Sequence, residues 1–131
     1  GSSSLDRYWG AGTGLQNAHF ISTIDNGGTI STVSAPTDAT TDYKMLSYTS
    51  DGAAWKIYVN KVDQTLTVRD GSNAGAWFND LTTPDVVSTG YVFQSSGGGG
   101  TGRMRAELYS EPLTTQERSD LYDIFVAFGL L

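Results

Sequence analysis

Alternating hydrophobic and polar residues along the chain predict β-strands. The clearest run is 55–60, with the sequence WKIYVN, in which Trp55, Ile57 and Val59 fall on one face of a strand. The residues between them are polar or amphipathic and fall on the other face. This pattern predicts a strand that covers a core with its apolar face and meets water with the other.

Two similar segments flank this strand. Residues 44–49 lead into it through the turn signal Ser-Asp-Gly at 50–52. Residues 64–69 follow it and repeat the alternation, with Leu66 and Val68 predicted to point inward. We therefore expect the three segments to form an antiparallel meander.

Weaker strand signals lie on both sides of the meander. They fall at 18–24, 29–34, 86–87, 91–94 and 103–109. The Asp-Asn-Gly-Gly run at 25–28 predicts a hairpin between the first two, and the second is expected to break at 35–38, which contains a proline. Several short strands separated by turns are typical of a β-sandwich or barrel.

The period of the pattern changes near the C-terminus, where it predicts an α-helix over about residues 115–128. Thr114 and Glu117 have the spacing of a capping box, and Gly129 is a natural stop. An apolar stripe at helical spacing comprises Leu121, Ile124, Phe125 and Phe128. We expect the helix to dock this stripe across one end or face of the β-sandwich.

Two separated segments resemble a known family. Residues 103–118 (RMRAELYSEPLTTQER) resemble the last strand, turn and helix start of concanavalin A-like and laminin-G-like domains, and 51–60 (DGAAWKIYVN) resembles a hairpin of that family, with Lys61 where a glycine is usual. Residues 124–131 are similar to the C-terminal tail of its bacterial and phage members. The resemblance implies an all-β fold, an antiparallel jelly-roll sandwich with one C-terminal α-helix.

Length and composition fit one small domain. The 131 residues suit a single lectin-like domain over 5–131, preceded by a tag or linker remnant at 1–4. The net charge of −6 and the scattered Lys and Arg residues argue against nucleic acid as a partner. No apolar run reaches the roughly 20 residues that span a bilayer, so we expect no membrane insertion. Cysteine is absent, which excludes disulfides and thiolate metal sites.

Motifs for catalysis are weak, and we expect no enzyme activity. Glu107 and Glu111 are the close Glu pair before the helix, but a turn places the second off the strand, where it does not serve glycoside hydrolysis. His19 is the single histidine, and no G-x-S-x-G elbow accompanies it. The Gly-rich run 95–102 lacks the Lys-Ser/Thr of a phosphate loop, which leaves a flexible surface loop or a close approach to a ligand.

Aromatic residues in loop-like contexts are the main candidates for ligand binding. Trp9, Trp77 and Phe78 fall outside the clear strands. Exposed aromatic rings stack on sugars, and neighbouring amides and carboxylates bond to hydroxyl groups. The candidate polar partners are Asn73, Asn79 and Asp80. The alternative is that each aromatic ring covers an open end of the sandwich.

A calcium ion is the one cofactor that the sequence suggests. Asp70, Asn73 and Asp80 lie in loops, and Ca²⁺ takes six to eight oxygen ligands of this kind. Asp, Asn and Gly are also the residues that turns require, so a purely structural reading stays open. We expect no other cofactor.

The family resemblance implies a non-catalytic, lectin-like domain that recognises a glycan or another cell-surface ligand. The expected setting is the receptor-binding tip of a phage tail fibre or spike, on a virion or outside the cell, and such tips are commonly homotrimers. Two alternatives stay open. One is a structural or decorating virion module without ligand, and the other is an accessory carbohydrate-binding module of a secreted bacterial protein.

Overall fold

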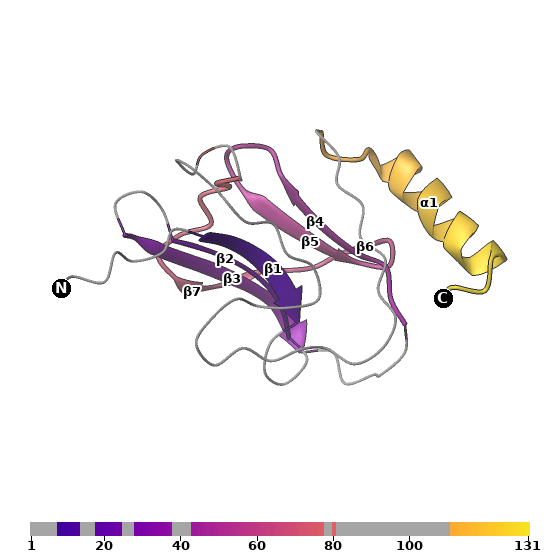
Figure 1. The fold of residues 1–131 in the computed structure, drawn as a ribbon, viewed down its shortest axis with the longest axis horizontal. Helices are drawn as coiled ribbons and strands as arrows, with labels where there is room; N and C mark the ends of the chain where they lie inside the picture. Colours follow the sequence, from indigo (N-terminus) through magenta and orange to yellow (C-terminus); the bar gives the residue numbers. More distant parts are fainter. Residues whose placement is uncertain (1–7, 14–17, 25–27, 38–42, 78–79, 81–110) are drawn as a thin grey trace.

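Seven β-strands and one α-helix make up the part of the chain that the computed structural model describes (Figure 1). That part comprises residues 8–13, 18–24, 28–37, 43–77, 80 and 111–131. The elements are β1 (Tyr8–Thr13), β2 (Ala18–Ile24), β3 (Ile30–Thr37), β4 (Leu46–Ser50), β5 (Trp55–Val59), β6 (Val62–Asp63), β7 (Thr67–Asp70) and α1 (Thr115–Ala127). The predicted strands at 86–87, 91–94 and 103–109 lie outside the described residues.

The described strands form two antiparallel sheets. One has four strands in the order β1-β2-β3-β7, and the other has three in the order β4-β5-β6. The expected all-β class with one C-terminal helix is confirmed at this level.

Strand β1 has no counterpart in the sequence prediction. Its sequence, YWGAGT, contains two glycines and so lacks the alternation that marks a strand. It is nevertheless paired with β2 along its whole length, from Tyr8 opposite Ile24 to Thr13 opposite His19. The loop-like context assigned to Trp9 is therefore wrong, because Trp9 lies within β1.

The predicted hairpin between β2 and β3 is confirmed, but β3 continues past the predicted break at Pro36 and ends at Thr37. The pairing explains how a proline fits. Phe20 is opposite Ser34 while Ala18 is opposite Thr37, so β3 has one extra residue over this interval. Such a bulge leaves backbone groups out of the ladder, and proline, which has no N–H, is tolerated there.

The predicted three-strand meander is confirmed only for its first two strands. The chain closes that sheet with the short strand β6 and then crosses to the other sheet, where β7 pairs with β3, Val68 opposite Val33. Val68 is 48% exposed, so its predicted inward position is wrong, whereas Leu66 packs against the core. Alternation shows which residues share a face, but it does not show which sheet a strand joins.

An apolar cluster of buried residues joins the two sheets. The four-stranded sheet contributes Ile21, Val33 and Ala35, and the three-stranded sheet contributes Trp55 and Ile57. The predicted inward face of β5 is confirmed by Trp55 and Ile57, which are 1% and 0% exposed. The other face of β5 therefore points away from the core.

The helix begins and ends as its sequence predicts, with both ends satisfied by local hydrogen bonds. The Thr114 hydroxyl accepts from the backbone N–H of Glu117, whose side chain accepts from the Thr114 N–H. At the other end Gly129 has a φ of +66°, and the Leu130 N–H donates to the Phe125 carbonyl. This is the αL stop that glycine favours.

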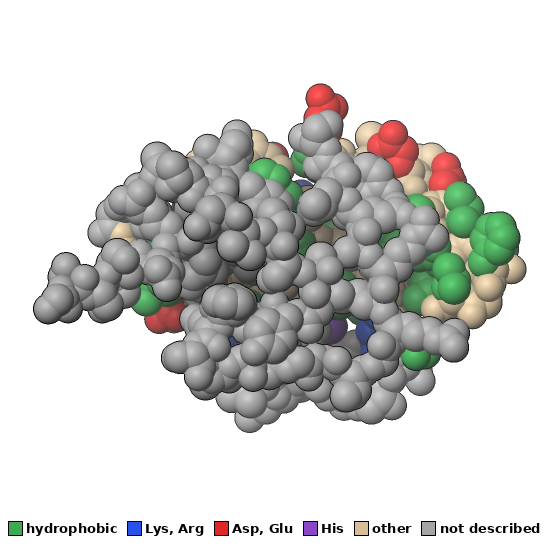
Figure 2. Space-filling model, viewed as in Figure 1, with side chains coloured by type: hydrophobic (Ala, Val, Ile, Leu, Met, Phe, Trp, Pro, Cys, Tyr) green, Lys and Arg blue, Asp and Glu red, His purple; other side chains and the backbone are tan. Residues whose placement is uncertain are grey.

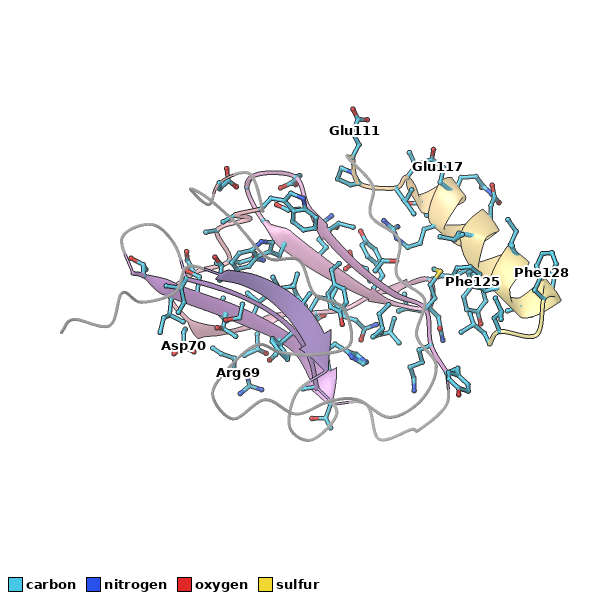
Figure 3. The ribbon with its side chains drawn as sticks, viewed as in Figure 1. Arg69, Asp70, Glu111, Glu117, Phe125 and Phe128 are labelled. Atoms are coloured by element: carbon cyan, nitrogen blue, oxygen red, sulfur yellow. The ribbon has the colours of Figure 1, made fainter. Side chains whose placement is uncertain are left out.

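The expected docking of the apolar stripe is wrong. Ile124 is 49% exposed and Phe128 77% exposed, and Leu121 and Phe125 are only partly buried. Figure 2 shows hydrophobic side chains on the surface at the end of α1, and in Figure 3 Phe128 points away from the strands. The buried residue of α1 is instead Arg118, which is 4% exposed.

Candidate binding groove

The outer face of the β4–β5 hairpin carries the candidate site. Lys56 and Tyr58 alternate with the core residues Trp55 and Ile57, so they point to the opposite side of the sheet. Thr49 lies directly opposite Lys56 in the ladder and shares that face. The first turns of α1 reach this surface at the Tyr58 ring.

Arg118 joins α1 to this face. The carbon at the centre of its guanidinium group lies 3.6 Å from the centroid of the Tyr58 ring, which is a close cation–π contact. Its Nη2 donates to the Leu113 carbonyl at 2.8 Å, in the segment before the helix. Its Nε is buried and has no hydrogen-bond partner. The guanidinium is therefore held in place with part of its hydrogen-bonding capacity unused.

A groove opens beside this contact, with a volume of about 100 Å³. It is lined by Thr49, Asp51, Ala54, Lys56, Tyr58, Pro112, Leu113 and Arg118. Lys56 and Arg118 bring two positive charges, and Asp51 brings one negative charge. The lining thus combines an aromatic ring, hydroxyl groups and charges, the mixture that orients a small polar ligand.

Asp51 has a structural task at one end of the groove. Its Oδ1 accepts from the backbone N–H groups of Ala53 and Ala54, each at 2.9 Å. These hydrogen bonds, first that of Ala53 and then that of Ala54, lower the pKa of the Asp51 carboxyl, although the side chain is exposed. Asp51 therefore stays ionised and shapes the β4–β5 turn.

The segment from Asn73 to Ala76 fixes the same turn from its other side. Asn73 accepts from the Trp55 N–H at 2.6 Å and donates to the Trp55 carbonyl at 3.1 Å, and the Trp55 indole donates to the Ala76 carbonyl at 2.6 Å. The Ser50 hydroxyl donates to the Gly75 carbonyl. The Asn73 amide, predicted to contact a ligand, is thus occupied with the backbone of β5.

Of the other residues predicted to bind a ligand, the structure describes Trp77 and Asp80 most fully. The Trp77 N–H donates to Asp80 Oδ2 at 2.6 Å, and the Asp80 N–H donates to the Trp77 carbonyl at 3.0 Å. Trp77 is partly buried, which leaves some of its surface accessible. Phe78 and Asn79 lie outside the described residues, and Trp9 is described by its backbone alone.

Two of the three predicted calcium ligands, Asn73 and Asp80, are hydrogen-bonded to other groups. Asn73 Oδ1 accepts from Trp55, and Asp80 Oδ2 accepts from Trp77. Asp70 is exposed at the end of β7 (Figure 3). Within the described ranges, no three Asp, Glu, His or Cys side chains come together as metal ligands would.

The two described residues that were weighed for catalysis, His19 and Glu111, are not part of the groove lining. His19 is in β2 and 5% exposed, so it belongs to the interior. Glu111 is exposed in the segment before α1, where Figure 3 shows it pointing away from both sheets. Glu107 and the Gly-rich run 95–102 lie outside the described residues.

Sequence reasoning missed the groove because its key residue has no distinctive signal. The outward positions of Lys56 and Tyr58 follow from the alternation in β5. Arg118 is an ordinary first-turn residue of an amphipathic helix, and such a charge is usually exposed. Only the three-dimensional placement of α1 reveals that Arg118 is buried.

No helix in the described ranges is long and apolar enough to cross a bilayer. Comparisons with protein-family models, with curated proteins and with solved structures found no match.

Proposed function

We propose that the chain is a non-catalytic binding domain of the concanavalin A-like, jelly-roll type, which recognises a glycan on a cell surface. The observation that carries the proposal is the groove between the β4–β5 hairpin and the start of α1. Thr49, Lys56, Tyr58 and Arg118 lie in strands or in the helix, and a rigid wall preserves the positions of hydrogen-bonding groups. The family resemblance of residues 51–60 and 103–118 supports the same role.

The chemistry of the groove suits a sugar. Thr49 offers a hydroxyl group, and Lys56 offers an exposed ammonium group, so both can bond to sugar hydroxyls. Pro112, Leu113 and the Tyr58 ring supply the apolar surface on which the C–H faces of a sugar ring pack. A volume of about 100 Å³ matches part of one residue of an oligosaccharide, with the rest in solvent.

An oligosaccharide array followed by titration calorimetry tests the proposal. We expect Lys56→Ala to weaken binding of the recognised glycan several-fold, because Lys56 lines the groove. Lys61→Ala is the matched control, since it removes the same charge at an exposed site outside the groove lining. Equal binding by wild type and Lys56→Ala, with loss in Trp77→Ala, would move the site to Trp77. Absence of binding to every glycan on the array would contradict a glycan-binding role.

The apolar end of α1 favours a second role, in assembly. Ile124, Val126, Phe128 and Leu130 are 46–77% exposed in one short stretch, and such a surface is typical of a contact between protein chains. We propose a homo-oligomer, a trimer at the tip of a phage tail fibre or spike, on a virion or outside the cell. Light scattering should give a mass of three chains, and Phe128→Asp should reduce it to one. A monomeric wild-type protein would contradict this assembly.

A further inference from the structure

Arg118 is a buried positive charge without a negative partner in the described part of the chain. Its side chain is 4% exposed, and its guanidinium contacts one backbone carbonyl and one aromatic ring. A buried ion is costly unless it is paired and its hydrogen bonds are made. The Nε of Arg118 makes none. Arg118 can therefore form an ion pair and a further hydrogen bond with an anion.

Each nearby described carboxylate is already engaged. Asp51 accepts two backbone N–H groups of its own turn. Glu117 accepts from Thr114 at the start of α1, and Asp123 pairs with Lys61 at 2.7 Å. None of these acids forms an ion pair with Arg118, so within the described ranges its charge is open to an anionic ligand.

The balance of charge in the groove points the same way. Lys56 and Arg118 contribute +2 and Asp51 contributes −1, which leaves +1 among the lining residues of a chain whose net charge is −6. Arginine also binds carboxylates in a planar, two-bonded geometry that a neutral hydroxyl cannot match. A local positive site on an acidic protein selects for a negative group.

We propose that the groove recognises the carboxylate of an acidic sugar and that Arg118 and Lys56 bind this negative group. The inference rests on the proposed glycan-binding function and narrows it to uronic acids and related sugar acids. The sugar ring then packs on the apolar groove residues Pro112 and Leu113.

An NMR titration with two matched probes tests the inference. Methyl glucuronide and methyl glucoside differ only in carrying a carboxylate or a hydroxymethyl group. We expect the glucuronide to shift the backbone signals of Lys56, Tyr58 and Arg118 and to bind at least about tenfold more tightly, as a charged hydrogen bond of about 1.4 kcal/mol would give. Equal binding of the two sugars would overturn the carboxylate inference and leave the glycan-binding proposal standing.

A third probe separates the sugar from the acid. N-acetylglutamate amide carries a carboxylate without a sugar ring, and we expect it to bind more weakly than the glucuronide. If it binds as tightly and neither sugar competes with it, the site reads peptide carboxylates, and both proposals are wrong. If none of the three probes binds, both are wrong as well.

Substitutions test which residues recognise the negative charge of the ligand. Lys56→Met should weaken glucuronide binding about two- to fivefold more than it weakens glucoside binding, the effect of an exposed ion pair. Lys61→Met is the control and should change neither. Arg118→Lys keeps the charge but loses the planar geometry, and we expect at least about a tenfold loss for the glucuronide. Should Arg118→Lys fail to fold, Lys56→Met still decides the inference, because an unchanged preference for the glucuronide would overturn it.

Discussion

The two sheets and the helix are attached to the molecule in different ways. Where the sheets meet, the buried side chains are apolar, and Ile21, Val33, Trp55 and Ile57 are at most 1% exposed. Where α1 meets the three-stranded sheet, the buried side chain is the charged Arg118, and apolar residues of the helix remain in solvent. An element can therefore form from its own local signals and yet contribute little to the shared core.

The free energies expected for the two kinds of contact support this distinction. Burial of apolar surface contributes about 25 cal/mol per Å², so a fully buried tryptophan stabilises the fold by several kcal/mol. The ion pair between Lys61 and Asp123 has a distance of 2.7 Å, but its side chains are 40% and 62% exposed. Exposed pairs contribute about 0–1 kcal/mol. We infer that the sheets unfold as one unit and that α1 is held more weakly.

The largest expected effect on the free energy of unfolding comes from removing one aromatic side chain from each region, the core between the sheets and the end of α1. Trp55→Ala removes a side chain that is 1% exposed and its indole hydrogen bond to Ala76, so we expect a loss of about 3–5 kcal/mol in the free energy of unfolding. Phe128→Ala removes a side chain that is 77% exposed and should change that energy by less than about 0.5 kcal/mol.

Urea denaturation followed by circular dichroism measures both variants. A large loss of unfolding free energy in Phe128→Ala would contradict the weak attachment of α1, because it would mean that the end of the helix is buried. A small loss in Trp55→Ala would show that the cluster between the sheets is not the main core.

The next effect concerns how the hairpin turn is fixed to the sheets. Gly75 has a φ of +65° and is buried, and a Cβ there would overlap the backbone nitrogen of Ala54. Gly52 has a φ of +82°, but a Cβ there would meet no atom within 4 Å. We expect Gly52→Ala to cost about 1–2 kcal/mol from the backbone alone, and Gly75→Ala to cost about 1–3 kcal/mol more.

The melting temperatures of the two glycine variants, measured by thermal unfolding, give the difference in their stability. Equal melting temperatures would contradict the close approach of Gly75 to the turn. They would also weaken the view that residues 73–76 position the groove wall, since that approach is part of the same contact.

The sequence predicts local features of this chain well, and pairing between distant segments poorly. The capping box of Thr114 and Glu117 and the alternation of β5 depend on neighbouring residues, and both are confirmed. The pairing of β7 with β3 depends on a connection between sheets that no local pattern records. Strand β1 was missed because its glycines contribute no side chain to an alternating pattern.

The candidate site shows the same limit more sharply. Asn73 has the residue type and loop position of a ligand-binding amide, yet its hydrogen bonds go to the backbone of Trp55. Arg118 has the position of a solvent-exposed helix residue, yet it is buried on Tyr58. In both cases the role is set by which segment lies opposite, and that depends on tertiary packing.

A smaller effect tests whether α1 can loosen while the sheets stay folded. Thr114→Ala removes the hydroxyl that accepts from the Glu117 N–H and should cost the helix about 1 kcal/mol. Thr115→Ala is the matched control, because Thr115 is the next residue, is exposed and is not the cap. We expect Thr114→Ala to lower the melting temperature of the helical dichroism signal and to leave that of the tryptophan fluorescence nearly unchanged, because all three Trp residues lie outside α1. Coincident shifts of both signals would mean that helix and sheets unfold together.

The smallest effect is a dependence on acid that should appear first in the helix. Hydrogen bonds from the backbone and then from the hydroxyl of Thr114 lower the pKa of Glu117. A lowered pKa means stability that is present above the unfolded value of about 4.3 and is lost as the pH falls through the lower, folded value. We therefore expect α1 to fray below about pH 4. Glu117→Gln keeps an acceptor at this position but does not titrate, so NMR signals of residues 114–118 should lose this acid-dependent change in that variant. If the wild-type and variant signals respond alike between pH 5 and pH 2, the capping box contributes nothing to the acid response, and the attachment of α1 depends on Arg118 instead.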